Sequence, residues 1–201
     1  MDDAAIEKMR SKRKQVAMEL LTTEETYVKN LQDMMNVFCS PMEKNANGSE
    51  DKRVISKDDV RTIFGNVKII LPINKMLLAD LKEQLSGVNE GETILIGKAF
   101  KNMAYCLRSY VSYCTDFETS RKILQQHKEN PQFVSFFQSL HDKTIIGNST
   151  LKDYLIMPVQ RVPRYRMLLA EILKNTWEGH SDYEPLREAL SNISATAQVI
   201  E

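Results

Sequence analysis

Residues 151–169 read LKDYLIMPVQRVPRYRMLL, and the spacing of their apolar residues is helical. From Leu151 to Ile172 the apolar positions recur every three or four residues, which is the period of one helix face. Pro158 and Pro163 interrupt the pattern. Each proline removes a backbone hydrogen bond and would cost about 3 kcal/mol in a free helix interior. The sequence therefore predicts a helix from Ser149 to Lys174 that bends near Pro158 and is held by packing.

The N-terminal segment has the same period. Thr23 fills a gap in its apolar stripe, which consists of Val16, Leu20, Tyr27, Leu31, Met34 and Phe38. The sequence predicts a first helix from about residue 4 to 39 that ends at Pro41. The polar stretch over residues 43–53 has no apolar period and predicts an exposed loop.

Further helices are predicted along the rest of the chain. Ser56 precedes Asp59 by three residues, which is a helix-start signal. The apolar stripe that follows passes through Pro72, where we expect a kink or a break, and ends near Gly87. The other predicted helices are a long one over residues 96–117, a short one opening at Asn130-Pro131, and one over residues 183–200.

Composition agrees with this helical reading. The chain of 201 residues has only 7 Gly and 6 Pro, whereas an all-β fold needs many turns rich in these residues. No strand pattern, internal repeat or low-complexity segment is visible. We therefore expect an all-α fold, an elongated bundle of five or six long helices forming a single domain over residues 1–201.

Charge and cysteine content disfavour several classes of protein. Lys+Arg and Asp+Glu both number 27, so the net charge is zero and nucleic acid is not an expected partner. No apolar run approaches the roughly 18 residues of a membrane span, and the N-terminus lacks the apolar core of a signal peptide. The 3 cysteines are too few and too scattered for a disulfide framework. A cytoplasmic, reducing setting is expected.

Motifs for catalysis are scarce. His127, His141 and His180 lie far apart, and none belongs to a zinc-ligand pattern. Phosphate-binding and nucleophile motifs are absent as well. An acid/base pair stays open, because 27 carboxylates always offer some pair. We expect no metal and no cofactor, and a helical interaction domain is favoured over a hydrolase or a redox enzyme.

Two segments stand out as candidate binding surfaces. In the first, ELLTTEETYVKNL over residues 19–31, Glu19 and Thr23 share one helix face. The second, residues 151–174, carries five bases and two acids, with arginines interleaved among Tyr, Ile and Met. Both fit ordinary solvated helix faces. The second also has the composition of a protein-binding hot spot, in which Arg and aromatic residues dominate.

Together the two segments resemble the Dbl-homology domain of Rho-family guanine-nucleotide exchange factors. ELLTTEETYVKNL matches the first family block, and DYLIMPVQRVPRYRMLL over residues 153–169 matches the third. A weaker middle block is similar to residues 96–117, so the resemblance covers nearly the whole chain. The resemblance implies an elongated bundle of about six helices.

The resemblance also implies a function, the release of nucleotide from a Rho-type GTPase without covalent chemistry. In it Glu19 accepts hydrogen bonds from switch I, and Arg164 binds switch II. An Ile at the position of Ile156 is similar to the family members that are directed to Rac-type GTPases. The residues that the resemblance places at the GTPase interface are Glu19, Thr23, Ile156, Gln160, Arg161, Arg164, Arg166 and Glu201.

Three positions depart from the family pattern. Met157 stands where the family often has Lys, and Pro163 stands where an ordinary helix former is more common. Glu201 stands where the family usually carries an Asn that contacts switch II. Met157 and Glu201 support an alternative, a non-catalytic scaffold that binds a GTPase or another partner without releasing nucleotide. A third alternative, an unrelated helical enzyme, would need a buried polar constellation.

The resemblance also bears on what lies beyond this domain. In the family a pleckstrin-homology domain follows directly, so we expect one downstream of residue 201. Contact with a membrane would come only through that further domain, which would recruit a cytoplasmic protein to the plasma membrane.

Overall fold

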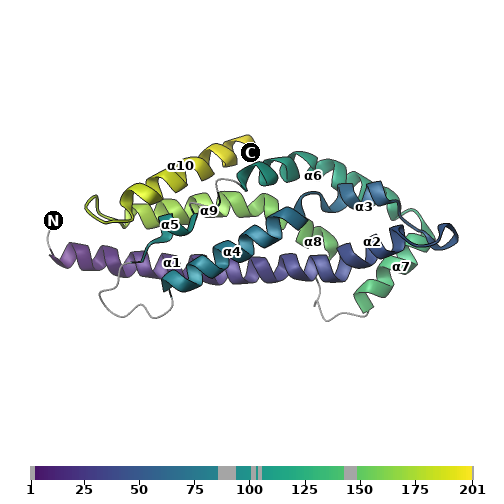
Figure 1. Ribbon diagram of the computed structural model, residues 1–201, viewed down its shortest axis with the longest axis horizontal. Helices are drawn as coiled ribbons and strands as arrows, with labels where there is room; N and C mark the ends of the chain where they lie inside the picture. The colour runs from purple at the N-terminus through teal and green to yellow at the C-terminus, as the bar shows by residue number, and fades with distance from the viewer. Residues whose placement is uncertain (1–2, 86–93, 101–102, 104–105, 143–148, 201) are drawn as a thin grey trace.

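The computed structural model describes residues 3–85, 94–100, 103, 106–142 and 149–200. Within these residues there are helices and no strands, so the predicted all-α class is confirmed (Figure 1). The α-helices are α1 (Asp3–Met34), α2 (Ser40–Ala46), α3 (Lys57–Phe64), α4 (Val67–Leu85), α5 (Ile96–Phe100), α6 (Leu107–His127), α7 (Pro131–Asp142), α8 (Leu151–Leu155), α9 (Met157–Lys174) and α10 (Tyr183–Ile200). A π-helical turn, Met35–Cys39, joins α1 to α2, and a 3-10 turn occupies Glu50–Lys52.

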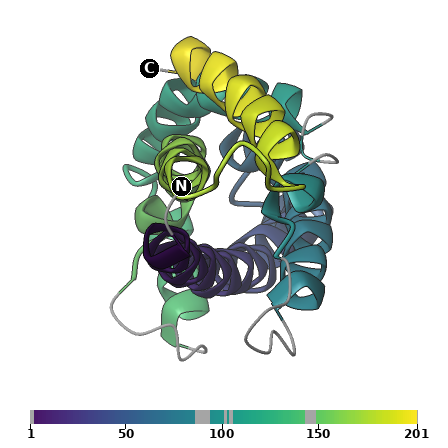
Figure 2. The ribbon, with the colours of Figure 1, turned by 90° about the vertical axis from the view of Figure 1, so that its left-hand side faces the viewer.

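The molecule is an elongated bundle. Together α1 and α2 extend along its length, and α9 and α10 lie side by side above α1 (Figure 1). Seen along the axis, α1, α4, α9 and α10 surround the core (Figure 2). Contacts across the bundle join α1 to both α4 and α9. The apolar stripes predicted for these helices face inward, because burial of one face is what stabilises an amphipathic helix.

The first helical segment does not stop at Pro41, so that prediction is wrong. The chain continues through the π-helical turn into α2, and Pro41 occupies the first turn of α2. A proline there forfeits no helix-interior hydrogen bond, because the first N–H groups of a helix have no partner within it. The stretch predicted as an exposed loop, residues 43–53, accordingly begins as helix, with Ala46 buried.

The break predicted at Pro72 is wrong, because the helical segment is interrupted at Gly65 instead. Ser56 caps α3 as predicted, since its Oγ accepts a hydrogen bond from the Asp59 backbone N–H at 3.0 Å. The chain then turns at Gly65, whose φ of +47° suits glycine, and α4 passes through Pro72 without a break. Pro72 is exposed, so water can satisfy the carbonyl that has lost its donor.

The segment Lys57–Leu85 is, within the described residues, one helical stretch long and apolar enough to cross a membrane. Length and composition alone are weak evidence for a membrane span, because a buried helix of a bundle core has the same composition. Here Ile63, Ile70 and Leu81 are fully buried in the bundle core.

The helix predicted over residues 96–117 is also interrupted. The described residues show α5 ending at Phe100 and α6 running from Leu107 to His127, well beyond the predicted end. Of the apolar positions predicted for this helix, five are buried and two, Val111 and Cys114, are half-buried; the buried ones are Ile96, Phe100, Met103, Leu107 and Phe117. Gly97 allows α5 to touch α10, because a Cβ there would lie 2.4 Å from the Leu186 backbone nitrogen.

The segment with two prolines is interrupted near Pro158, as predicted. Helix α8 ends at Leu155, Ile156 forms the junction, and Pro158 lies in the first turn of α9. The helix begins at Leu151, and not at Ser149 as predicted, and Thr150 is its cap. The Thr150 backbone N–H and hydroxyl both donate to the Asp153 carboxylate, at 2.7 and 2.8 Å. The final predicted helix is confirmed as α10.

Candidate protein-binding surface on helices α1 and α9

Glu19 and Arg164 meet on the surface of the bundle. The Arg164 Nη2 donates to the Glu19 Oε1 at 2.5 Å. Both side chains are open to solvent, with exposed fractions of 45% for Arg164 and 48% for Glu19. The structure therefore brings together the two charged residues that the sequence placed in a common binding site.

Helices α1 and α9 run antiparallel along this surface. Glu19 pairs with Arg164 and Glu24 pairs with Arg161, so residue numbers rise along α1 in the direction in which they fall along α9. A negative and a positive charge are thus presented next to each other on adjoining helices.

The neighbouring candidate residues extend this surface. Ile156, Gln160 and Arg164 are spaced four residues apart, which places them along one side of the junction and of the first two turns of α9. Gln160 is exposed and Ile156 is half-buried. On α1, Thr23 is half-buried, and its hydroxyl donates to the Leu20 carbonyl at 3.1 Å. We call Glu19, Thr23, Ile156, Gln160 and Arg164 the α1–α9 surface.

The other candidates do not join the surface in this way. Arg161 is 6% exposed, so its guanidinium lies inside the bundle and cannot face a partner in this structure. Arg166 is half-buried. Glu201 lies outside the described residues. In this structure Arg161 therefore belongs to the core, where Glu24 neutralises its charge, and its contact with a GTPase stays a prediction.

Arg161 belongs to a buried polar network around Glu24. The Glu24 Oε2 accepts from Arg161 Nη2 at 2.5 Å and from the Tyr165 hydroxyl at 2.6 Å. The Glu24 Oε1 accepts from Asn74 Nδ2 at 2.9 Å. The Tyr110 hydroxyl donates to Asn74 Oδ1 at 2.9 Å.

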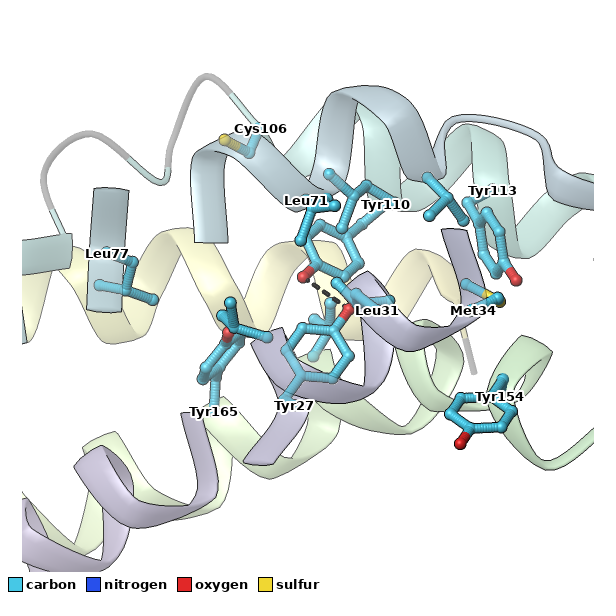
Figure 3. Close-up of a cluster of buried hydrophobic side chains, with 14 of the residues drawn as sticks. Tyr27, Leu31, Met34, Leu71, Leu77, Cys106, Tyr110, Tyr113, Tyr154 and Tyr165 are labelled. Atoms are coloured by element: carbon cyan, nitrogen blue, oxygen red, sulfur yellow. Dashed lines mark hydrogen bonds between the residues drawn. The ribbon is translucent and has the colours of Figure 1, made fainter. Parts of the chain in front are cut away.

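Tyr27 extends this network. Its hydroxyl lies 3.0 Å from that of Tyr110, and the two side chains point their hydroxyl groups toward one another within the core, with Tyr165 nearby (Figure 3). We call Glu24, Tyr27, Asn74, Tyr110, Arg161 and Tyr165 the buried network.

Sequence reasoning missed this network. Glu24, and not Thr23, fills the gap in the buried stripe between Leu20 and Tyr27, at the spacing of i, i+4 and i+7. That spacing was the available signal. A carboxylate on an apolar stripe indicates a buried ion pair, because charged groups are almost never fully buried unless they are paired.

Electrostatics agree with a permanently charged Arg161. Burial alone lowers the pKa of its guanidinium, but the neighbouring Tyr165 and Glu24 outweigh burial and raise this pKa overall. Burial, then Glu24, raises the pKa of Tyr165 well above its ordinary value, so its hydroxyl stays a donor. No buried side-chain nitrogen or oxygen among the described residues lacks a hydrogen-bond partner.

Other groups offer little covalent chemistry. Burial raises the pKa of the Cys39 thiol to about 12, and raises that of Cys106 and Cys114 to about 11. These thiols are protonated at neutral pH, and a thiolate is the reactive form. The described residues contain no group of three or more His, Cys, Asp or Glu side chains that could hold a metal ion. What the α1–α9 surface can do is exchange its ion pair for hydrogen bonds to another protein.

Comparison with known proteins shows which family this chain is similar to. Residues 16–201 match the model of the RhoGEF domain family. The chain is 37% identical over 175 residues to RhoGEF domain-containing protein gxcJ of Dictyostelium discoideum, a match that covers 87% of this chain and 14% of that protein. It is 33% identical over 192 residues to Rac guanine nucleotide exchange factor JJ of the same organism, covering 96% of this chain and 16% of that protein.

A solved structure gives the same result in three dimensions. The Vav1 exchange factor superimposes with a TM-score of 0.78 at 27% identity, over 94% of this chain and 48% of the Vav1 chain. The chain thus spans only 14% and 16% of the two curated relatives.

Proposed function

Because this chain belongs to the RhoGEF domain family, we propose that it is a guanine-nucleotide exchange factor that binds the switch regions of a Rho-type small GTPase and promotes release of GDP. The observation that carries the proposal is the solvent-exposed ion pair between Glu19 and Arg164. The α1–α9 surface presents the acid and the base at the positions that the family resemblance assigns to switch I and switch II.

The two residues have opposite tasks. The Glu19 carboxylate accepts hydrogen bonds from switch I and draws it away from the nucleotide. The Arg164 guanidinium donates to switch II and reshapes it, which closes the magnesium site and loosens the phosphates. Hydrogen bonds to charged groups are worth about 1.5–3 kcal/mol each, enough to hold a switch in a new conformation.

The ion pair in the free domain does not obstruct this exchange of partners. Exposed pairs are worth about 0–1 kcal/mol, because water screens them and two long side chains must be ordered. Opening the pair between Glu19 and Arg164 therefore costs less than the hydrogen bonds that each residue gains from a GTPase. In the free domain the pair also keeps each side chain near the position it needs.

Catalysis follows from differential affinity. An exchange factor that binds the nucleotide-free GTPase more tightly than the loaded form shifts the GTPase toward the nucleotide-free form, and no covalent step is required. The net charge of zero is compatible with this function, because only the contacting faces need to be complementary. Among Rho-family GTPases we propose a preference for Rac types, because Ile156 lies on the α1–α9 surface and an Ile at this position is similar to the Rac-directed members of the family.

The test is release of a fluorescent GDP analogue from a panel of Rac-, Rho- and Cdc42-type GTPases. We expect the domain to accelerate release from at least one of them, with Rac types fastest. Binding to a nucleotide-free GTPase without accelerated release would favour the scaffold alternative, to which Met157 and Glu201 point. If the domain bound no member of the panel and accelerated release from none of them, the proposal would be overturned.

A further inference from the structure

Four helices contribute charged or polar side chains to one buried cluster in the middle of the bundle. Glu24 comes from α1, Asn74 from α4, Tyr110 from α6, and Arg161 and Tyr165 from α9. Glu24, Asn74, Tyr110 and Tyr165 are 0% exposed. A helical bundle ordinarily fills such positions with apolar side chains, so the buried network requires a separate explanation.

Stability alone does not explain it. Taking two charges out of water has a large desolvation cost, and replacing a buried ion pair by apolar residues of similar volume is often neutral or stabilising. The best-attested use of buried polar groups is to fix the register in which helices pack, because any other register leaves a charge without its partner.

The network lies where register matters for the α1–α9 surface. Glu24 follows Glu19 by five residues on α1, and Arg161 precedes Arg164 by three residues on α9. Sliding α1 past α9 by one helical turn, about 5.4 Å, would separate both pairs at once. The exposed pair is too weak to prevent such a slip. The buried pair, in which Arg161 Nη2 and Nε lie 2.5 and 3.2 Å from Glu24 Oε2, is not.

We propose that Glu24, Arg161 and Tyr165 are positioning residues for nucleotide exchange, which set the register of α1 against α9 and so place Glu19 and Arg164 for the GTPase. This inference rests on the proposed exchange function. It gives Arg161 a role without contact with the GTPase, which fits its burial.

The first experiment is steady-state exchange by Tyr165→Phe, which leaves the ring in place. It removes the hydroxyl that donates to Glu24 Oε2 at 2.6 Å and accepts from Asn74 Nδ2 at 2.7 Å. Its matched control is Ser120→Ala, which removes a buried hydroxyl whose 2.7 Å hydrogen bond to the Ile63 carbonyl joins α6 to α3. Thermal melts give the stability that each variant loses. We compare the two variants at a temperature where both remain folded.

The expected result is a split between kinetic constants. If only a fraction of molecules holds the competent register, apparent affinity falls by that fraction, while the saturated rate is kept. We expect Tyr165→Phe to raise KM for the GTPase about five- to tenfold with little change in kcat, because the hydrogen bonds of its hydroxyl to Glu24 and Asn74 are lost. Ser120→Ala should stay within about twofold of wild type in both constants. Equal kinetic constants for the two variants would overturn the proposal.

A second variant removes the buried charges altogether. Glu24→Leu combined with Arg161→Met replaces the ion pair by apolar side chains. We expect a folded domain with raised KM, because apolar contacts tolerate a shifted register. Wild-type KM in this folded double variant would also overturn the proposal. If the double variant does not fold, Tyr165→Phe still decides.

Amide hydrogen exchange in the free domain tests the register without any GTPase. We expect Tyr165→Phe to accelerate exchange in peptides from α1 and α9 more than Ser120→Ala does. Unchanged protection of those peptides would contradict the positioning role. If wild type released no nucleotide from any GTPase while Tyr165→Phe still loosened α1 and α9, the proposed function would fail and the register role would stand.

Discussion

The Glu19 carboxylate and the Arg164 guanidinium, 145 positions apart in the sequence, form an ion pair of 2.5 Å between α1 and α9. The pair is exposed, whereas the pair one turn away, Glu24 with Arg161, is buried. Two ion pairs thus join the same two helices in different surroundings. The buried pair can hold the helices in place, and the exposed pair remains available to a partner protein.

Glu19→Ala should separate binding from stability. Glu19 is exposed, so truncation should change the free energy of unfolding by no more than about 0.5 kcal/mol. Loss of its hydrogen bonds to switch I should slow nucleotide release by about one to two orders of magnitude, since each factor of ten corresponds to about 1.4 kcal/mol. The measurements are fluorescent-nucleotide release and a parallel thermal melt.

The matched control for Glu19→Ala is Glu25→Ala. Glu25 is also an exposed acid on α1, 46% exposed, but it pairs with Lys82 of α4, away from α9. The Glu25→Ala variant should promote release of nucleotide from the GTPase at the wild-type rate. Lost exchange together with a collapsed melt for Glu19→Ala would show instead that Glu19 is structural.

Arg164→Ala should reduce release to a similar extent as Glu19→Ala, with a near-normal melt. Arg164→Glu should be worse, because it sets like charges against an acidic switch II. Arg121→Ala is the control, since Arg121 is an exposed arginine on α6 paired with Glu118. Normal exchange by Arg164→Ala would remove this residue from the proposed mechanism.

Ile156 should bias the choice of GTPase without deciding it. A one-methyl change of shape in an apolar contact is worth about 1–3 kcal/mol, so a preference is the most to expect. Relative release rates from Rac-, Cdc42- and RhoA-type GTPases measure it, and Ile156→Val should narrow the Rac preference. Several-fold faster release from Cdc42 or RhoA types by wild type would show that this interpretation of Ile156 is wrong.

His180 should make stability fall in mild acid. Burial, with Arg13 and Arg10 nearby, lowers the pKa of its imidazole from 6.5 to about 4. Between these values the unfolded chain binds a proton that the folded domain does not, so stability falls as pH drops through that window and levels off below it. Burial raises the pKa of the adjacent Asp182, and this carboxyl acts in the opposite direction.

A variant isolates the contribution of His180. His180→Gln should show a smaller fall in melting temperature between pH 7 and pH 5 than wild type shows. Identical pH profiles for the two proteins would contradict the lowered pKa.

Most of the helices could be predicted from sequence because apolar periodicity is a local property. One exception is the helix predicted over residues 96–117, which is divided into α5 and α6, and the others are segments that contain prolines. The cost of Pro41 and Pro72 depends on whether the missing hydrogen bond falls in a first turn or on an exposed face, and that is fixed by the three-dimensional packing. The segment around Pro158 was predictable because its stripe continued on both sides of the interruption.

The candidate site was predictable in part. Glu19 and Arg164 could be named from sequence motifs, but their contact could not, because it joins distant segments. Arg161 and Arg164 differ little in sequence, since both lie in the same basic helix. Only the partner Glu24, 137 positions away, decides that one is buried and the other exposed.

The most direct measurement is nucleotide release by the doubly reversed variant Glu19→Arg with Arg164→Glu. This variant keeps an ion pair between α1 and α9 but presents each charge to the wrong switch region. We predict a melting temperature close to that of wild type and a loss of exchange of at least about one to two orders of magnitude. Wild-type exchange by this variant would contradict the assignment of Glu19 and Arg164 to the GTPase-binding surface.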